Sequence, residues 1–233
     1  MYYSPIGESY DRDRVADYRR HLTKTYALMA LGLAVTFGAA IVTALFLPHL
    51  FVFNFYVSVA LLVAEVVTVI AFSAMLPRAK VGTLIAMYFF YALLTGLSIS
   101  YIFVLYDLGR VYLCFAAAAL SFAIMALLGH TTKRDLSAFG HVFLAGIVGL
   151  VFLTIVGILI HSETIEIIIS CVGLVLFLGI TAVDAQRLRR FYENAGGDSR
   201  LTAKYAIYTA LQFYLDFINI FFYLVRLFGR NRR

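Results

Sequence analysis

The sequence predicts an all-α membrane protein, a seven-transmembrane-helix bundle with the last helix at its centre. Composition predicts the membrane class. Hydrophobic residues make up 63% of the 233 residues and charged residues 14%, and the mean hydropathy is +0.90. A soluble domain usually carries about 25% charged residues. The number of long apolar stretches predicts the number of helices, and the polar pattern of the last stretch predicts its central place.

Seven stretches are long enough to cross the hydrocarbon core, which takes about 20 mostly apolar residues. They lie at residues 27–47, 52–76, 81–106, 111–129, 140–160, 164–186 and 204–228. Pro48 and Pro77 follow the first two stretches, where proline can end a helix. We therefore expect one transmembrane domain at residues 27–228, between a polar N-terminal tail at 1–26 and a short basic tail at 229–233.

Basic residues predict the orientation of the bundle. The N-terminal tail and the connections after the second, fourth and sixth stretches contain fourteen Lys and Arg residues, whereas the connections on the opposite side contain only Arg110. Because cytoplasmic loops are enriched in Lys and Arg, we expect a cytoplasmic N-terminus. The four arginines in the segment "RLFGRNRR" oppose this rule if the last stretch crosses the membrane, but its apolar length of about 25 residues favours crossing.

The net charge of +6 has the same origin. Positive loops that face the cytoplasm also attract anionic membrane lipid, so the basic balance predicts a lipid environment and no nucleic-acid partner. Cys114 and Cys171 both lie in apolar stretches and are interpreted as small packing residues.

Three acidic residues lie inside the apolar stretches: Glu65, Asp184 and Asp216. A charged side chain at the centre of a bilayer costs at least about 2.5–3.5 kcal/mol, and such residues commonly mark an ion or proton pathway. The alternative is a structural role, in which a protonated carboxyl forms a hydrogen bond between helices. Three acids without a basic partner at the same depth favour the pathway.

The last stretch has a polar face. Its polar residues recur at steps of three, four, three, four and three, which places them on one side of a helix. These residues are Thr209, Gln212, Asp216, Asn219, Tyr223 and Arg226. A helix that faces lipid would not carry such a stripe, so we expect the last helix inside the bundle.

Counting along the chain places the acids at different depths. Asp184 lies three residues before Arg187 and should be near the cytoplasmic edge, while Asp216 lies near the middle of its helix. At ~1.5 Å per residue, the two differ by about 10 Å in height. They would meet only if the last helix enters late or if a water-filled vestibule opens from the cytoplasm. A close pair would share a proton and titrate as a unit.

Three segments carry a resemblance to a known family. The segments "GHTTKRDLSAFG" (129–140), "GITAVDAQRL" (179–188) and "YLDFINIFFYLVRLFG" (214–229) resemble the signatures of the Bax inhibitor-1 family, and of its bacterial YccA/YbhL-like members in particular. The resemblance extends over almost the whole chain from about residue 20. It implies a seven-helix bundle with a central last helix, a pH-sensitive calcium leak, and a place in the bacterial cytoplasmic (inner) membrane.

The resemblance also implies roles for particular residues. In the family, one aspartate on each of the last two helices gates the pore from the cytoplasmic side, and Asp184 and Asp216 match these positions. A glutamate and an arginine of the second helix belong to the same pathway. Glu65 matches the glutamate, but the candidate gate arginine Arg78 lies thirteen residues later, at the end of the stretch. Some members bind membrane proteases or affect cell-death pathways.

The leading hypothesis is a pH-sensitive cation leak, with Ca²⁺ as the ion and no cofactor. Calcium prefers oxygen ligands. Asp184, Asp216 and Glu65 are therefore the candidate Ca²⁺ ligands, and Gln212, Thr209 and Asn219 are further pathway residues. Protonation of the aspartates at low pH would release a basic partner and open the cytoplasmic gate.

Two other functions stay open. In the first, the protein is a regulator that binds a membrane protease or another partner without transporting ions. Alternatively, it would be an intramembrane aspartyl protease, since two aspartates on neighbouring helices are also the arrangement of presenilin-like enzymes. Those enzymes carry Tyr-Asp and Gly-x-Gly-Asp, whereas the contexts here are "AVD" and "YLD". We therefore expect no enzymatic activity.

Overall fold

The computed structural model describes residues 5–51, 54–160 and 162–229, and within these ranges the chain forms helices and no strands. Seven of the helices are long and apolar enough to cross a membrane, which confirms the predicted fold class. The helices are α1 (Pro5–Phe46), α2 (Pro48–Phe51), α3 (Phe55–Met75), α4 (Val81–Leu105), α5 (Leu108–Thr131), α6 (Phe139–Ile160), α7 (Glu163–Asn194) and α8 (Ser199–Phe228).

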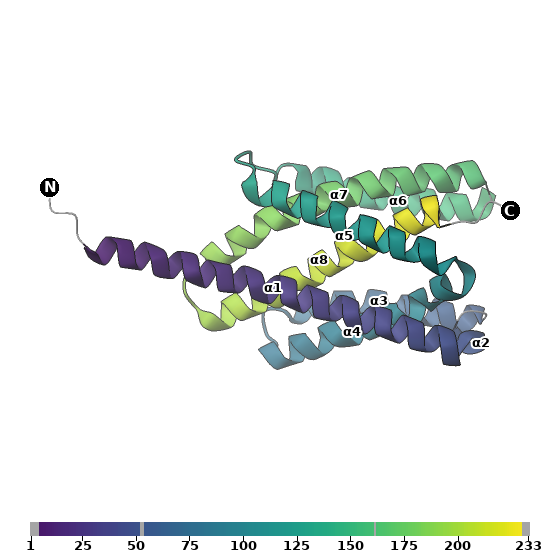
Figure 1. Ribbon diagram of the computed structural model, residues 1–233, viewed down its shortest axis with the longest axis horizontal. Helices are drawn as coiled ribbons and strands as arrows, with labels where there is room; N and C mark the ends of the chain where they lie inside the picture. The colour runs from purple at the N-terminus through teal and green to yellow at the C-terminus, as the bar shows by residue number, and fades with distance from the viewer. Residues whose placement is uncertain (1–4, 52–53, 161, 230–233) are drawn as a thin grey trace.

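The first helix begins much earlier than the apolar stretch predicts. Residues 8–31 contain neither glycine nor proline, so nothing interrupts the helix between the polar segment and the membrane span. Its 42 residues correspond to about 63 Å, twice the ~30 Å of a hydrocarbon core. Figure 1 shows the start of α1 reaching beyond the rest of the bundle. The expected tail at 1–26 is therefore, from Pro5 onward, the same helix as the first span.

The loops after α3, α5 and α7 lie at the end of the bundle where α1 begins, and we call this the basic end (Figure 1). The turn from α7 to α8 is short because Gly196 and Gly197 adopt positive φ angles of 58° and 88°. Asp198 then caps α8, since its Oδ1 accepts hydrogen bonds from the backbone N–H groups of Arg200 (2.7 Å) and Leu201 (3.2 Å).

Helix α8 occupies the centre of the bundle, as its polar stripe predicts. It packs against α1, α4, α5 and α7. Figure 1 shows it crossing the bundle diagonally behind α1 and α5 and ending opposite the basic end. It is one unbroken helix of 30 residues, so the last segment runs through the bundle and does not turn back. Helix α6, in contrast, lies at the periphery and packs mainly on α7.

Two glycines allow neighbouring helices to approach closely. A Cβ atom at Gly129 of α5 would lie 2.2 Å from the carbonyl oxygen of Ala182 in α7. At Gly96 of α4, it would lie 2.5 Å from the carbonyl oxygen of Thr36 in α1. These crossings fix α7 against α5 and α1 against α4, as small residues do in membrane bundles.

Candidate functional site

The two aspartates of the last helices come together inside the bundle. Asp184 of α7 and Asp216 of α8 are only 4% and 3% exposed. Their carboxyl groups are near enough to interact electrostatically, and Asp184 is the largest charged influence on Asp216. Counting residues along the two helices predicted a difference of about 10 Å in their height, yet the two carboxyl groups interact. Counting assumes level, parallel helices, whereas α8 crosses the bundle diagonally (Figure 1).

Arg187 is the basic partner of this pair. Its Nη1 donates a hydrogen bond to Oδ1 of Asp184 over 3.1 Å, and the two residues lie one turn apart on α7. The Arg187 side chain is 37% exposed, so it reaches from the buried carboxylate toward the surface. Arg187 also acts electrostatically on Asp216. From the sequence, Arg187 indicated only the depth of Asp184, although the spacing Asp-x-x-Arg predicts a contact on a helix.

Arg78, the candidate gate arginine, lies elsewhere. It stands in the exposed turn after α3, where its backbone N–H donates to the carbonyl oxygen of Met75 over 3.0 Å. Within the residues that the structure describes, its side chain forms no ion pair. The position thirteen residues after Glu65 leaves it beyond the end of the helix, so the arginine beside the aspartates comes from α7.

Asp216 has an unsatisfied oxygen. Its Oδ2 is buried and has no hydrogen-bond partner in the described part of the chain. The hydroxyl of Thr181 lies beside the Asp216 carboxyl and donates a hydrogen bond to the carbonyl oxygen of Phe177, at 2.8 Å. A buried carboxylate oxygen normally has a partner, and water or an ion is the usual one where protein supplies none.

Two more orphaned oxygens continue from Asp216 toward the basic end. Oε1 of Gln212 and Oγ1 of Thr209 are buried and also without a partner among the described residues. The three residues lie within about 10 Å along α8. Asn219 behaves differently, because its Nδ2 donates to the carbonyl oxygen of Leu215 in its own helix at 2.8 Å. The predicted stripe therefore divides into an unsatisfied part from Thr209 to Asp216 and a part with ordinary contacts beyond Asp216.

Glu65 belongs to a second, separate polar cluster. Its carboxyl lies between α3 and α4, beside the side chains of Ser98 and Tyr91, and its buried Oε1 has no hydrogen-bond partner in the described ranges. Tyr91 packs edge-on against Tyr214 of α8, whose hydroxyl lies 2.6 Å from Oγ1 of Thr36.

The two clusters thus occupy different sides of α8. The structure does not bring Glu65 to Asp184 and Asp216. In the part of the chain that the structure describes, no three His, Cys, Asp or Glu side chains gather where they could hold a metal ion. The three carboxylates predicted to bind Ca²⁺ are therefore not brought together in this structure. The candidate oxygen ligands that remain are those of the aspartate pair and of the amide and hydroxyl side chains that precede Asp216 on α8.

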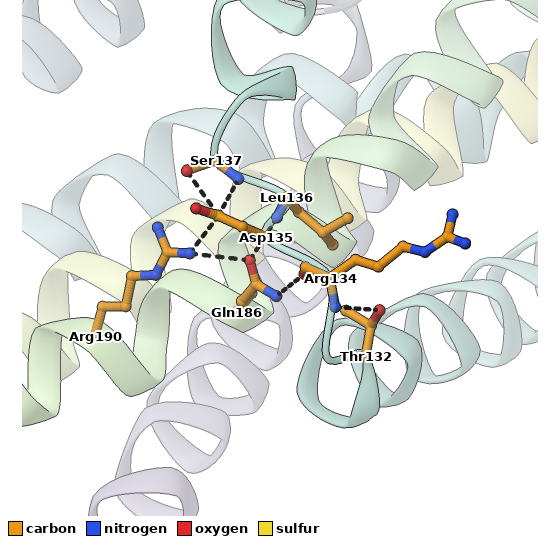
Figure 2. A network of polar contacts seen from close by, with 7 residues as sticks. All are labelled: Thr132, Arg134, Asp135, Leu136, Ser137, Gln186 and Arg190. Carbon is orange, nitrogen blue, oxygen red and sulfur yellow. Dashed lines mark hydrogen bonds and ion pairs between the residues drawn. The ribbon is translucent and has the colours of Figure 1, made fainter.

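A polar network at the basic end joins two of the sequence segments singled out above. Figure 2 shows Gln186 of α7 at its centre. The Oε1 of Gln186 accepts a hydrogen bond from the backbone N–H of Leu136 and its Nε2 donates to the carbonyl oxygen of Arg134, both at 2.8 Å. Arg190 forms an ion pair with Asp135. Hydrogen bonds from Ser137 and Arg190 hold the pKa of the Asp135 carboxyl well below its ordinary value.

These roles were not predicted from the sequence. The residues of the network lie about fifty positions apart, and no periodicity predicts contacts between separate segments. The network anchors the α5–α6 loop to α7 two residues from Asp184, so it helps to fix the position of the aspartate site.

Comparison with known proteins gives the family. The family model described as "Inhibitor of apoptosis-promoting Bax1" matches residues 18–233. The chain belongs to the Bax inhibitor-1 family. The resemblance of the three signature segments is thereby confirmed.

Bacterial relatives are similar over almost their whole length. Inner membrane protein YbhL of Escherichia coli (strain K12) is 34% identical over 228 residues, which cover 93% of this chain and 94% of YbhL. Protein RP147 of Rickettsia prowazekii (strain Madrid E) is 34% identical over 216 residues, covering 92% and 91%. A Deinococcus radiodurans protein is 35% identical over 214 residues, again covering 92% and 91%. This Bax inhibitor-1 family member is a multi-pass integral membrane protein.

Proposed function

We propose that the protein is a pH-sensitive cation leak, with Ca²⁺ as the permeant ion, and that Asp184 and Asp216 form its gate. The observation that carries the proposal is the row of buried oxygens without partners on α8, next to two interacting carboxyl groups. Such oxygens need water or a cation. Carboxylate, amide and hydroxyl oxygens are the ligands that Ca²⁺ prefers.

The gate operates through charge. At neutral pH the Asp184 carboxylate binds Arg187 one turn later on α7, and Arg187 also acts electrostatically on Asp216 of α8. Two carboxyl groups that interact electrostatically share protons readily, since protonating one relieves repulsion between them. At lower pH the pair takes up a proton, Asp184 loosens its hold on Arg187, and the row of oxygens opens to water from the basic end.

Orientation is part of the proposal. The basic end carries most of the Lys and Arg residues, so it faces the cytoplasm by the positive-inside rule. The name of YbhL places that relative in the inner membrane, and we propose the same membrane for this chain.

Reconstituted vesicles test the proposal. In vesicles loaded with a Ca²⁺ indicator, flux through the natural protein should rise as the pH falls. The double variant Asp184→Asn plus Asp216→Asn should lose this pH dependence. Asp17→Asn is the matched control, because Asp17 is an exposed carboxylate that forms only a solvent-exposed ion pair with Arg20, at 3.7 Å. An unchanged pH profile in the double variant would reject the gate.

A regulatory role is the second candidate function. Its support is the start of α1, which reaches beyond the bundle and offers a helical surface to a partner such as a membrane protease (Figure 1). A truncation of residues 1–14 that leaves Ca²⁺ flux intact and abolishes co-purification of a defined membrane protease would favour this role. If the truncation changes neither Ca²⁺ flux nor co-purification of the protease, the truncated segment has no part in either function.

An intramembrane protease is a weaker fit to the site. Aspartyl proteases activate a water held between two carboxyl groups that share a proton. Here one carboxylate oxygen of Asp184 already binds Arg187. Cleavage of a model transmembrane substrate that disappears in Asp216→Asn would overturn this view.

A further inference from the structure

Two hollows of opposite character meet at His130, at the last turn of α5. One is an apolar hollow of about 440 Å³ between α1 and α5, and the other is a polar hollow of about 580 Å³ between the α5–α6 loop and α7. His130 lines both. A shared residue makes them adjoining parts of one amphiphilic surface.

The apolar hollow is a gap between two helices that α8 closes from behind. Helices α1 and α5 each pack on α8, and neither packs extensively on the other over the described residues. Phe217 of α8 forms the floor, and small side chains such as Ala123 of α5 and Ala30 of α1 leave the gap open to the membrane. A hydrogen-bond contact of 2.8 Å between the Tyr26 hydroxyl and Nε2 of His130 bridges the gap at its basic end.

The length of this gap fits one lipid leaflet. On α5 it extends from Ala119 to His130, a distance of about 16 Å at ~1.5 Å per residue. That is roughly half of a ~30 Å hydrocarbon core. An acyl chain that enters beside His130 and runs along the gap would end near the middle of the membrane.

The polar hollow carries excess positive charge. Its lining includes four basic side chains and two carboxylates. The carboxylates are already paired, Asp135 with Arg190 and Glu193 with Arg189. Lys133 and Arg134 are exposed and their side chains have no partner among the described residues, and Figure 2 shows the Arg134 side chain extending away from the network. Two unpaired positive charges therefore stand at the basic end of the apolar gap.

We propose that this composite surface is a binding site for one anionic phospholipid of the leaflet at the basic end. The acyl chain lies in the gap between α1 and α5, and the phosphate lies beside Lys133 and Arg134. Basic pockets at the ends of membrane helices bind anionic headgroups in this way. A free phosphate would leave the apolar gap empty, and a zwitterionic lipid would leave the two positive charges uncompensated. The site does not depend on ion conduction.

Native mass spectrometry of the purified full-length protein tests the site. The probe is a dioleoyl phosphatidylglycerol added to delipidated protein, with dioleoyl phosphatidylcholine as the zwitterionic comparison. The natural protein should retain phosphatidylglycerol in preference. Lys133→Ala plus Arg134→Ala should lower its retention at least about tenfold, since each basic side chain near the headgroup contributes to the attraction. Lys80→Ala plus Arg200→Ala removes two exposed charges from the same end and should change little.

A second pair of variants tests the apolar half. Ala123→Phe fills the gap and should also lower retention of phosphatidylglycerol, whereas Ala117→Phe, on a lipid-exposed position of α5 outside the gap, should not. Circular dichroism and size-exclusion profiles establish that each variant is folded. Equal retention of both lipids, or retention unchanged in either Lys133→Ala plus Arg134→Ala or Ala123→Phe, would overturn the proposal. If retention is unchanged only in Ala123→Phe, the ligand is held by its phosphate alone.

Discussion

The bundle contains two acidic centres that differ in their partners. The Asp184–Asp216 centre lies between α7 and α8, where each carboxyl interacts with the other and Arg187 supplies a positive charge. Glu65 lies between α3 and α4, where the neighbouring groups are the hydroxyls of Ser98 and Tyr91. A buried acid therefore acts as a switch only when another charged group responds to its protonation. Glu65 has no such group beside it in the described structure.

The largest effect should come from closing the space at a helix crossing. Gly129→Ala would push a Cβ atom against the backbone of Ala182, two residues from Asp184. We expect a loss of about 3 kcal/mol in stability, because backbone cannot move aside as a side chain can, and a loss of the pH response of Ca²⁺ flux.

Gly96→Ala is the comparison at the other centre, since Gly96 packs on Thr36 in the region of Ser98. It should destabilise the protein to a similar extent and leave the pH response in place. Gly38→Ala, which meets no atom within 4 Å, is the neutral control. Thermal unfolding in detergent measures stability for all three. A pH response that survives in Gly129→Ala and fails in Gly96→Ala would reverse the assignment of the two centres.

Removing the arginine should have the next largest effect. Arg187→Gln leaves the Asp184 carboxylate buried without a positive partner, which costs about 1–3 kcal/mol. This range is below that of a fully buried pair because the Arg187 side chain is 37% exposed. Arg189→Gln breaks the exposed pair with Glu193 and should change stability by less than about 1 kcal/mol. Equal losses in the two variants, measured by thermal unfolding, would mean that Arg187 does not support the buried pair.

A smaller effect is expected at the second acidic centre. Glu65→Gln removes a carboxyl group without an ionic partner and retains the shape of the side chain, so stability should change by at most about 1 kcal/mol. The midpoint of the pH response of Ca²⁺ flux should stay where it is in the natural protein. A shifted midpoint would join Glu65 to the gate.

The smallest effect should come from Asp135, an exposed acidic residue. Hydrogen bonds from Ser137 and Arg190 lower the pKa of Asp135 in the folded state. Its contribution to stability is therefore fully present above the unfolded-state value of about 3.9 and is lost as the pH falls below it. Asp135→Asn should slightly lower the melting temperature at neutral pH and make no difference under strongly acidic conditions. A larger deficit at acidic than at neutral pH would contradict this sign.

The sequence predicted the span count from the length of the apolar stretches and the central position of α8 from the periodicity of its polar residues, and both signals lie within single segments. The same periodicity singled out Asp216, Gln212 and Thr209. Contacts between helices were harder to predict. The choice between Arg187 and Arg78 and the separation of Glu65 from the aspartates depend on helix crossing angles, and no pattern within a single helix encodes these.

The start of α1 and the Gln186 network were missed for different reasons. The polar residues before residue 27 suggested a tail, since hydropathy detects membrane spans and not the helical continuation beyond them. Gln186 is one polar residue among several near the end of α7. Only the fold of the α5–α6 loop places the backbone of Arg134 and Leu136 against it.

The proposed gate requires Asp184 and Asp216 to act as one titrating unit, and a double-mutant cycle on the pH profile of Ca²⁺ flux measures this coupling. Vesicles would contain the natural protein, Asp184→Asn, Asp216→Asn or the double variant, at matched protein density. If the carboxyl groups share a proton, either single variant removes most of the pH response and the double variant removes little more. If each single variant removes an independent part and the two parts add up in the double variant, the aspartates titrate separately and do not form the proposed gate.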